Sequence, residues 1–162
     1  GLRGLSYVEV TVTGPNRDLH SGLYGGAVAN PINVLAKMIA SLHDENNHIT
    51  IPGFYDGVPE LSDGMRAQWD ALQFDHAAFL GDVGLRIPAG EQDRTPLEMV
   101  WARPTCEVNG IYGGYHGDGS KTIIPAWAGC KVTMRLVPDQ DPEDILDRFE
   151  AHVQKTASPA VE

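Results

Sequence analysis

A histidine lies between a carboxylate and a hydroxyl in the stretch Arg-Asp-Leu-His-Ser-Gly, which covers residues 17–22. His20 beside Ser21 suggests a general base next to a nucleophile, and Asp18 suggests an orienting acid. Neighbouring residues of an extended chain point in opposite directions, however, and the chain has no Gly-x-Ser-x-Gly segment. These features do not favour a serine hydrolase, so the histidine needs another explanation.

Two stretches look like pieces of a metal site. Asp18–His20 and His116–Asp118 each place a carboxylate two residues from an imidazole. A hydrolytic zinc centre needs three or four such ligands and an activating carboxylate, and none of the six histidines belongs to a His-Glu-x-x-His motif. The two cysteines, Cys106 and Cys130, form no Cys-x-x-Cys pair. We therefore expect no metal site here, and two buried thiols in a reducing, cytoplasmic compartment.

Arg135 occupies the polar side of a regular alternation that covers residues 126–137. Two interpretations stay open for it: an ordinary solvent-facing side chain, or a guanidinium on a rigid strand that binds a carboxylate with two hydrogen bonds. The preceding glycine-rich stretch, residues 113–122, resembles a phosphate-binding loop but leads into a strand rather than a helix. Its glycines at 113, 114 and 119 either let the backbone approach a ligand or form a turn.

The composition fits one folded domain. The chain has 162 residues, 42% of them hydrophobic, and a net charge of -10. An acidic chain repels phosphate backbones, so nucleic acid is not an expected partner. No apolar run approaches the ~20 residues of a membrane span, so no membrane is expected either. The chain starts with Gly1 rather than Met, and we interpret it as a piece of a longer protein.

Hydrophobic periodicity predicts an α+β fold. Strands are expected over residues 7–13, 97–103, 105–112 and 126–137, and helices over 28–42 and from the cap Asp141 onward. Residues 44–100 are interpreted as an insertion of loops and short helices, with Ser62 and Asp75 as caps. The order predicts a split β-α-β (ferredoxin-like) antiparallel sheet of about four strands, with two main helices on one face.

Three segments together resemble a known family. Residues 12–42, 51–58 and 103–143 are similar, in order and spacing, to the carnosine dipeptidase branch of the co-catalytic zinc aminopeptidase and carboxypeptidase family. The resemblance covers one domain of that family, a lid and dimerisation domain, which would occupy residues 1–162. It implies that a separate catalytic domain, absent from this chain, holds two divalent metal ions, expected to be zinc. This chain would bind no cofactor.

The resemblance also implies roles for single residues. His20 corresponds to a lid histidine that reaches the active site of the partner subunit and donates a hydrogen bond to the developing oxyanion. Arg135 corresponds to the residue that binds the substrate's C-terminal carboxylate. Thr122 corresponds to a further substrate contact, and Asn109 lies in a matching motif and is a substrate-binding candidate. Asp18 and Ser21 then become loop-shaping residues.

The resulting hypothesis is a domain that dimerises and covers the active site of a metal-dependent dipeptidase or amidohydrolase. Its partners would be a second copy, the catalytic domain of the same protein, and a dipeptide or N-acyl amino acid. The dimer contact is expected at helix 28–42 and a neighbouring edge strand, and the isolated chain is expected to be inactive. The rival hypothesis is a free-standing ferredoxin-like regulatory or ligand-binding module without hydrolase activity.

Overall fold

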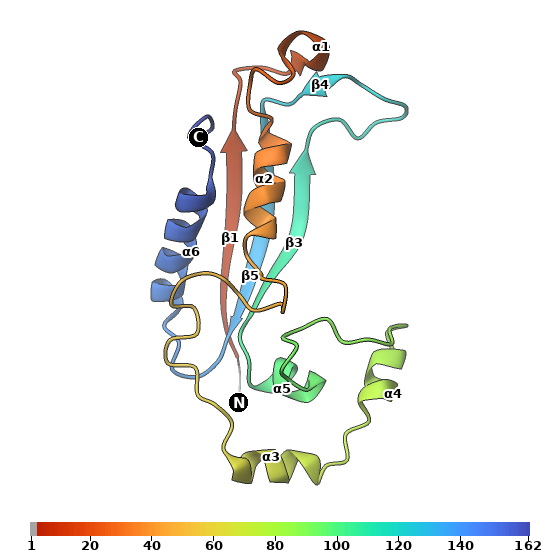
Figure 1. Ribbon diagram of the computed structural model, residues 1–162, viewed down its shortest axis with the longest axis vertical. Helices are drawn as coiled ribbons and strands as arrows, with labels where there is room; N and C mark the ends of the chain where they lie inside the picture. Colours follow the sequence, from red (N-terminus) through yellow and green to blue (C-terminus); the bar gives the residue numbers. More distant parts are fainter. Residues whose placement is uncertain (1–2) are drawn as a thin grey trace.

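The protein has two layers, an antiparallel sheet and a pair of helices that cover one of its faces (Figure 1). The computed structural model describes residues 3–162. The main sheet has three strands in the order β1-β5-β3, and a separate two-stranded ladder joins β2 to β4. The strands are β1 Gly4–Thr13, β2 Leu19–His20, β3 Thr105–Gly113, β4 Ile123–Ile124 and β5 Trp127–Leu136. The helices are α1 Ser21–Tyr24, α2 Pro31–Ala40, α3 Asp63–Asp70, α4 His76–Gly81, α5 Pro96–Trp101 and α6 Pro142–Thr156.

The predicted α+β class and the split β-α-β order are confirmed, with three strands where about four were expected. The last residues of the chain bond to the free edge of β1. Thr13 N–H donates to the Glu162 carbonyl at 2.6 Å, and Glu162 N–H donates back to the Thr13 carbonyl at 2.8 Å. A reciprocal pair of this kind is the repeat unit of an antiparallel ladder.

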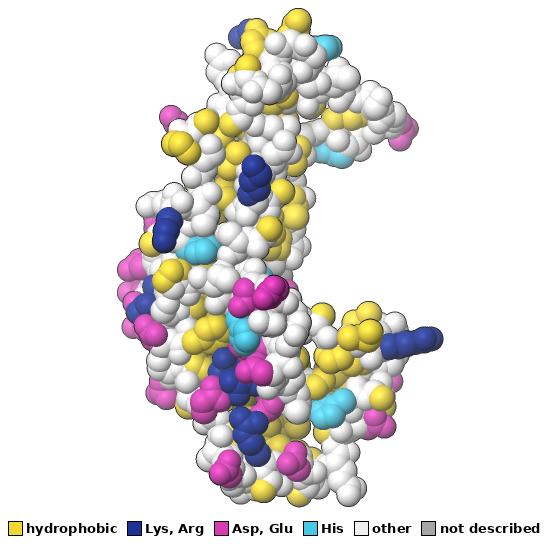
Figure 2. Space-filling model, viewed as in Figure 1, with side chains coloured by type: hydrophobic (Ala, Val, Ile, Leu, Met, Phe, Trp, Pro, Cys, Tyr) yellow, Lys and Arg dark blue, Asp and Glu magenta, His cyan; other side chains and the backbone are white. Residues whose placement is uncertain are grey.

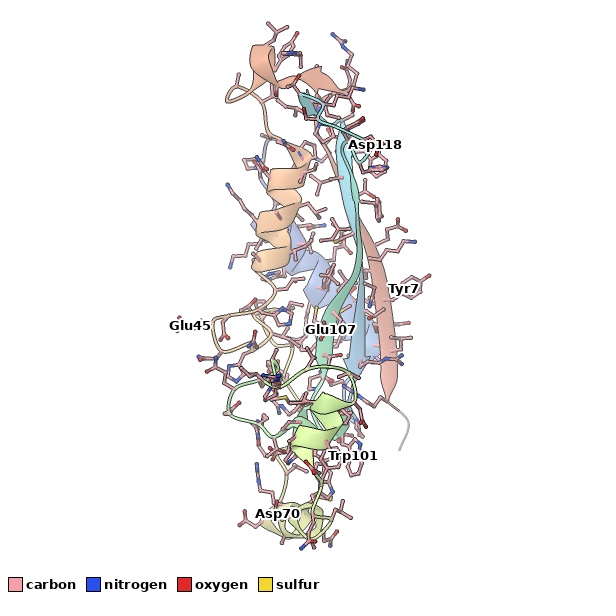
Figure 3. The ribbon with its side chains drawn as sticks, turned by 90° about the vertical axis from the view of Figure 1, so that its right-hand side faces the viewer. Tyr7, Glu45, Asp70, Trp101, Glu107 and Asp118 are labelled. Carbon is pink, nitrogen blue, oxygen red and sulfur yellow. The ribbon has the colours of Figure 1, made fainter. Side chains whose placement is uncertain are left out.

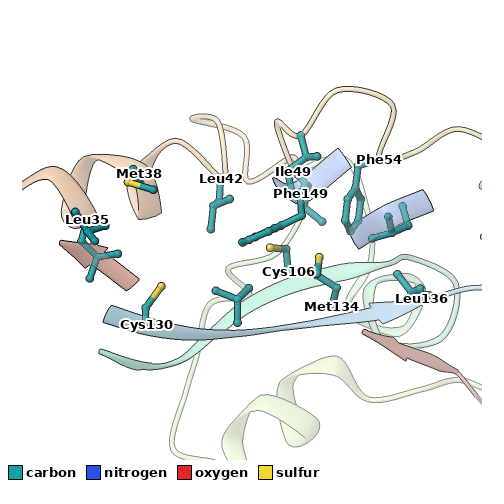
Figure 4. Close-up of a cluster of buried hydrophobic side chains, with 14 of the residues drawn as sticks. Leu35, Met38, Leu42, Ile49, Phe54, Cys106, Cys130, Met134, Leu136 and Phe149 are labelled. Carbon is teal, nitrogen blue, oxygen red and sulfur yellow. The ribbon is translucent and has the colours of Figure 1, made fainter. Parts of the chain in front are cut away.

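The core lies between the sheet and the helices α2 and α6. Leu35 and Met38 from α2 and Phe149 from α6 pack on the inner face of β5 (Figure 4). Met134 in β5 is 0% exposed, so the inner face of the central strand is excluded from water at this position. The inner side chains of β5 are the alternating apolar residues that the pattern predicted, namely Ala128, Cys130, Val132, Met134 and Leu136.

Both main helices begin at caps that satisfy their first amide groups. The Asn30 side chain accepts from Ile32 N–H at 2.9 Å, and Pro31 takes the first helical position. Helix α2 is therefore shorter than the predicted 28–42. Asp141 accepts from Glu143 N–H at 2.8 Å and starts α6, as predicted.

Within residues 3–162, no helix covers the other face of the sheet. Tyr7 is 71% exposed, and its side chain points away from the helical layer (Figure 3). Its neighbours on β1 and β5 alternate in the same way, with Lys131 and Arg135 exposed. This face mixes aromatic, charged and hydroxyl groups, so it is available for a polar contact surface.

Residues 97–103, predicted as a strand, are helical in their first part. Thr95 accepts from Glu98 N–H at 3.3 Å, and the Glu98 carboxylate accepts from Thr95 N–H at 2.8 Å. This capping box, with Pro96 in the first turn, nucleates α5. The run Val100–Trp101 suggested a strand, but a short apolar run fits a buried helix equally well. Ser62 and Asp75 do cap α3 and α4, as predicted.

A buried ion pair holds the segment before α5 against the start of β3. Arg103 donates from Nε and Nη2 to the two oxygens of Glu91, at 2.6 and 2.9 Å. Glu91 is 6% exposed and Arg103 8%, and the guanidinium lies over the Tyr55 ring at 4.8 Å from its centre. Burial raises the pKa of the Glu91 carboxyl, but hydrogen bonds from Arg103 and Tyr55 outweigh it and bring that pKa below its ordinary value.

Candidate functional site

His20 and Thr122 lie side by side beyond the end of β1. His20 pairs with Ile123 in the β2–β4 ladder, and Ser21 N–H donates to the Thr122 carbonyl at 3.0 Å. Both side chains are exposed. Two separate parts of the chain, the Arg17–Gly22 stretch and the end of the glycine-rich loop, are thus joined by backbone hydrogen bonds.

A local hydrogen bond orients the His20 ring. Its Nδ1 accepts from Gly22 N–H at 3.0 Å, so a neutral ring carries its proton on Nε2. The exposed Nε2–H is then a free donor. A Cβ at Gly22 would lie 2.7 Å from His20 Cε1 and 3.0 Å from Nδ1, so the close approach needs glycine at this position.

Asp18 and Ser21 have structural partners rather than catalytic ones. The Asp18 carboxylate accepts from Ala126 N–H at 2.9 Å and ties the loop after β1 to the start of β5. Ser21 begins the single turn α1, next to the histidine rather than facing it. The structure therefore assembles no Ser-His-Asp triad from these three residues.

Arg135 is far from His20 and Thr122. It pairs with Leu5 and Thr105 at the opposite end of β5, whereas Trp127 at the near end pairs with Thr13. Eight residues of strand separate Arg135 from Trp127, which corresponds to roughly 27 Å at about 3.4 Å per residue. One copy of the chain thus presents its candidate substrate contacts at two opposite ends of the sheet.

Asn109 is at a β-bulge in the middle of the edge strand β3. The register between β3 and β5 shifts between Val108 and Gly110, which leaves Asn109 as the extra residue. Its side chain is exposed and lies near neither end of the sheet where the other candidates are found. Its predicted role in substrate binding stays a prediction.

Two of the three loop glycines have packing reasons. At Gly113, with φ of 120°, a Cβ would come within 2.8 Å of the Ala128 backbone. At Gly114, with φ of 75°, it would meet the Ile32 side chain of α2 at 2.6 Å. Gly119 has φ of 76° and open space around it. The turn interpretation therefore accounts for the first two glycines without a ligand.

Potential metal ligands do not gather within residues 3–162, where no group of three His, Cys, Asp or Glu side chains could hold an ion. His116 and Asp118 lie in the exposed loop between β3 and β4. Burial raises the pKa of the Cys106 thiol to about 12 and also raises that of Cys130, so neither is a ready thiolate ligand. Among the helices of the same residues, none has the length and hydropathy needed to cross a bilayer.

Sequence reasoning missed the role of Gly22 and the buried Arg103–Glu91 pair. The spacing His-x-Gly was a usable signal for Gly22, because a side chain can accept from the amide two residues on. No comparable signal existed for the ion pair, since the fold of the insertion alone brings its two partners together.

The fold defines a two-layer α+β domain with the candidate residues His20 and Thr122 at one end of its sheet and Arg135 at the other. Residues 1–161 match the family model described as a peptidase dimerisation domain, and the chain belongs to that family.

Named relatives agree with the family. The chain is 36% identical over 155 residues to a Cys-Gly metallodipeptidase of Schizosaccharomyces pombe, covering 96% of the chain and 33% of that protein. It is 29% identical over 158 residues to human Beta-Ala-His dipeptidase, covering 98% of the chain and 31% of that protein. The chain thus spans about a third of the length of the curated relatives it matches.

Solved structures give the same result. The M20 family metallo-carboxypeptidase Sso-CP2 of Sulfolobus solfataricus superposes with a TM-score of 0.85 at 36% identity, over 96% of this chain and 41% of that one. The dipeptidase Dug1p of Saccharomyces cerevisiae superposes with a TM-score of 0.82 at 30% identity, over 96% of this chain and 33% of that one.

Proposed function

We propose that this chain is the dimerisation and lid domain of a metal-dependent dipeptidase or related amidohydrolase. Its substrate would be a dipeptide or an N-acyl amino acid. The two divalent metal ions, expected to be zinc, would be held by a catalytic domain outside residues 1–162. The observation that carries the proposal is the orientation of His20, whose Nδ1 is occupied by Gly22 N–H and whose Nε2–H is left free in an exposed position.

A free imidazole N–H suits one task in amide hydrolysis. When water adds to the scissile carbonyl, its oxygen becomes an oxyanion, and a donor placed there stabilises the transition state more than the substrate. His20 cannot act in this way alone, because the chain offers neither a nucleophile nor an activating base beside it. It would therefore serve a site that another part of the protein builds.

Thr122 and Arg135 would contact the substrate from two different copies of the domain. Thr122 lies beside His20, but Arg135 is about 27 Å along β5 from Trp127, which lies at the His20 end of the sheet. A dipeptide is too short to bridge that distance. We therefore infer that one active site takes His20 and Thr122 from one copy and Arg135 from the other.

The free edge of β3 and the neighbouring helix α2 are the proposed dimer surface. Ile111 on β3 is 65% exposed, and Ile32 on α2 is 38% exposed and close to Gly114 at the end of β3. Pairing two copies about a twofold axis through this edge runs the two β3 strands antiparallel. The His20 end of one copy then approaches the Arg135 end of the other, as a shared site requires.

Mixing two impaired variants of the full-length protein, assayed with the dipeptide well below the wild-type KM, tests this arrangement. His20→Ala should lower kcat by on the order of 10²–10³, and Arg135→Ala should mainly raise KM. After the two variants are dissociated and re-associated together, half of the dimers are mixed and each has one intact site. Dipeptide hydrolysis should therefore return to about one quarter of the wild-type rate.

The control is a mixture of His20→Ala with Thr122→Ala. These residues would come from the same copy, so each site of a mixed dimer lacks one of them and activity should stay low. Recovery in the control, or none with Arg135→Ala, would contradict the two-copy site. The boundaries of the domain at 1–162 and the cytoplasmic location stay predictions.

A further inference from the structure

We propose that residues 63–87, here called the arm, bind the loop between β3 and β4 of a second copy, residues 114–122. The arm contains α3, α4 and the turn that follows α4. This inference rests on the proposed pairing of two copies across β3. It adds an interface that the pairing alone does not require.

The arm carries a cluster of exposed apolar side chains that nothing else in residues 3–162 covers. Ile87 is 79% exposed and Val83 68%, values usual for charged rather than for large apolar residues. Large apolar side chains that gather exposed on one segment, here called the apolar patch, mark a contact surface in a water-exposed protein. The exposed apolar residues of the arm are Met65, Leu72, Phe79, Val83, Leu85 and Ile87.

The topology directs this patch toward a second copy. The arm precedes Thr105, the first residue of β3, and the β3–β4 loop follows Gly113, its last. When two identical strands run antiparallel, the segment before the strand in one copy lies opposite the segment after it in the other. The arm and the loop both project on the β3 side, with an open hollow between them (Figure 1, Figure 2).

Each surface carries an unpaired charge whose sign is opposite to that of a charge on the other surface. Arg86 is the arm's basic residue next to the apolar patch, and within residues 3–162 it forms no ion pair. Asp118, at the tip of the β3–β4 loop (Figure 3), likewise has no charged partner there. In one copy they stand on opposite sides of the hollow, so they can meet only between two copies.

A contact of the arm with the catalytic domain of its own chain is the competing occupant. The C-terminal end lies at the free edge of β1, where Glu162 bonds to Thr13, away from the arm. The N-terminal end lies beside α5, since Arg3 donates to the carbonyls of Val100 and Arg103. Antiparallel pairing of β3 places the loop of the second copy next to the arm, so the proposal commits to the second copy, and the crosslink below distinguishes it from the catalytic domain.

Photo-crosslinking of the full-length protein identifies the occupant directly. A benzoylphenylalanine residue replaces Ile87, and isotopically heavy and light chains are mixed before irradiation. The expected product joins a heavy to a light chain within residues 114–122. The matched control places the same group at Tyr7, on the open face away from β3, and should give no such product. Crosslinks from position 87 to the catalytic domain, or none at all, would overturn the proposal.

A charge-swap cycle tests the same interface without a probe. Arg86→Asp and Asp118→Arg should each raise the dimer dissociation constant by roughly tenfold, because each places like charges together twice in the dimer. The double variant should return toward wild type, measured by sedimentation of the full-length protein across a concentration series. Effects that merely add would show that the two side chains do not meet and would overturn the assigned contact. If the His20 and Arg135 mixture still regains activity, the shared site stands and only the arm contact is wrong.

Discussion

The two ends of the sheet are built by different physical means. At the His20 end, backbone groups do the positioning: Ser21 N–H to the Thr122 carbonyl, Gly22 N–H to the His20 ring, and Ala126 N–H to Asp18. At the Arg135 end, charged side chains dominate. Arg3 donates to the carbonyls of Val100 and Arg103, at 2.9 and 2.6 Å, beside the buried Arg103–Glu91 pair.

This difference indicates how each end responds to change. A site held by backbone hydrogen bonds is sensitive to substitutions that alter the backbone or crowd it. A site supported by a buried ion pair is sensitive to loss of either charge, because the remaining charge is left in a poorly solvated place. A substitution at one end of the sheet should therefore disturb the local structure of that end and leave the structure of the other end unchanged.

Removing Arg103 is expected to have the largest effect on stability. Arg103→Ala leaves the Glu91 carboxylate buried without its partner and should reduce the free energy of unfolding by about 3–5 kcal/mol, measured in urea. Hydrogen exchange should then quicken for amides near the start of β3 but not for Ser21. The control Arg148→Ala removes a more exposed cation that pairs with Asp144 and Asp56 and should reduce the free energy of unfolding far less. Equal losses in the two variants would refute the comparison.

Acid should weaken the Arg135 end through Glu91. The folded-state pKa of Glu91 lies below its ordinary value of 4.5, so its contribution is present above that value and disappears as the pH falls through the folded pKa. Wild type should be more stable than Glu91→Gln by a constant amount between about pH 6 and 8. Below about pH 4.5 this difference should shrink. A difference that stays constant on acidification would show that Glu91 does not titrate in this range.

Much of the fold was predictable because its signals are local. The alternation of Val8, Val10 and Val12 predicts β1, and Asp141 with Pro142 predicts the start of α6. The strand predicted over 97–103 was wrong because the Thr95–Glu98 capping box outweighed the apolar run after it. The two-residue strands β2 and β4 are too short to leave a periodic pattern, so only the folded chain reveals them.

The residues of the candidate site stay predictions, and part of their layout was already implied by their positions in the sequence. Thr122 precedes the predicted strand 126–137, and Arg135 lies near the end of that strand. Their positions in the sequence therefore already imply that the two residues are far apart in space. The Arg103–Glu91 pair could not be predicted, because no local sequence pattern indicates that residues 91 and 103 meet in a buried position. Long-range meetings of charged groups depend on the route of the insertion.

Enlarging Gly22 is the smallest perturbation that should separate the two ends. In Gly22→Ala the new Cβ would come within 2.7 Å of His20 Cε1, so the ring must turn and lose the bond from the residue-22 amide. In the full-length protein we expect kcat to fall roughly tenfold, about 1.4 kcal/mol in the barrier, with KM nearly unchanged because Arg135 is not disturbed.

The matched control is Gly64→Ala in α3, where no atom lies within 4 Å of the added Cβ. Gly64 belongs to the arm but is neither one of its exposed apolar residues nor its charge Arg86, so the proposed dimer contact is unaffected. Alanine favours a helix over glycine by about 1 kcal/mol, so this variant should unfold at a slightly higher urea concentration. It should also keep full activity. Nitrogen chemical shifts of His20 should report a mixed tautomer in Gly22→Ala and the Nε2–H form in Gly64→Ala. An unchanged kcat in Gly22→Ala, despite an altered tautomer, would mean that His20 does not act as the oxyanion donor. The orientation of the ring would then be a feature of the loop alone.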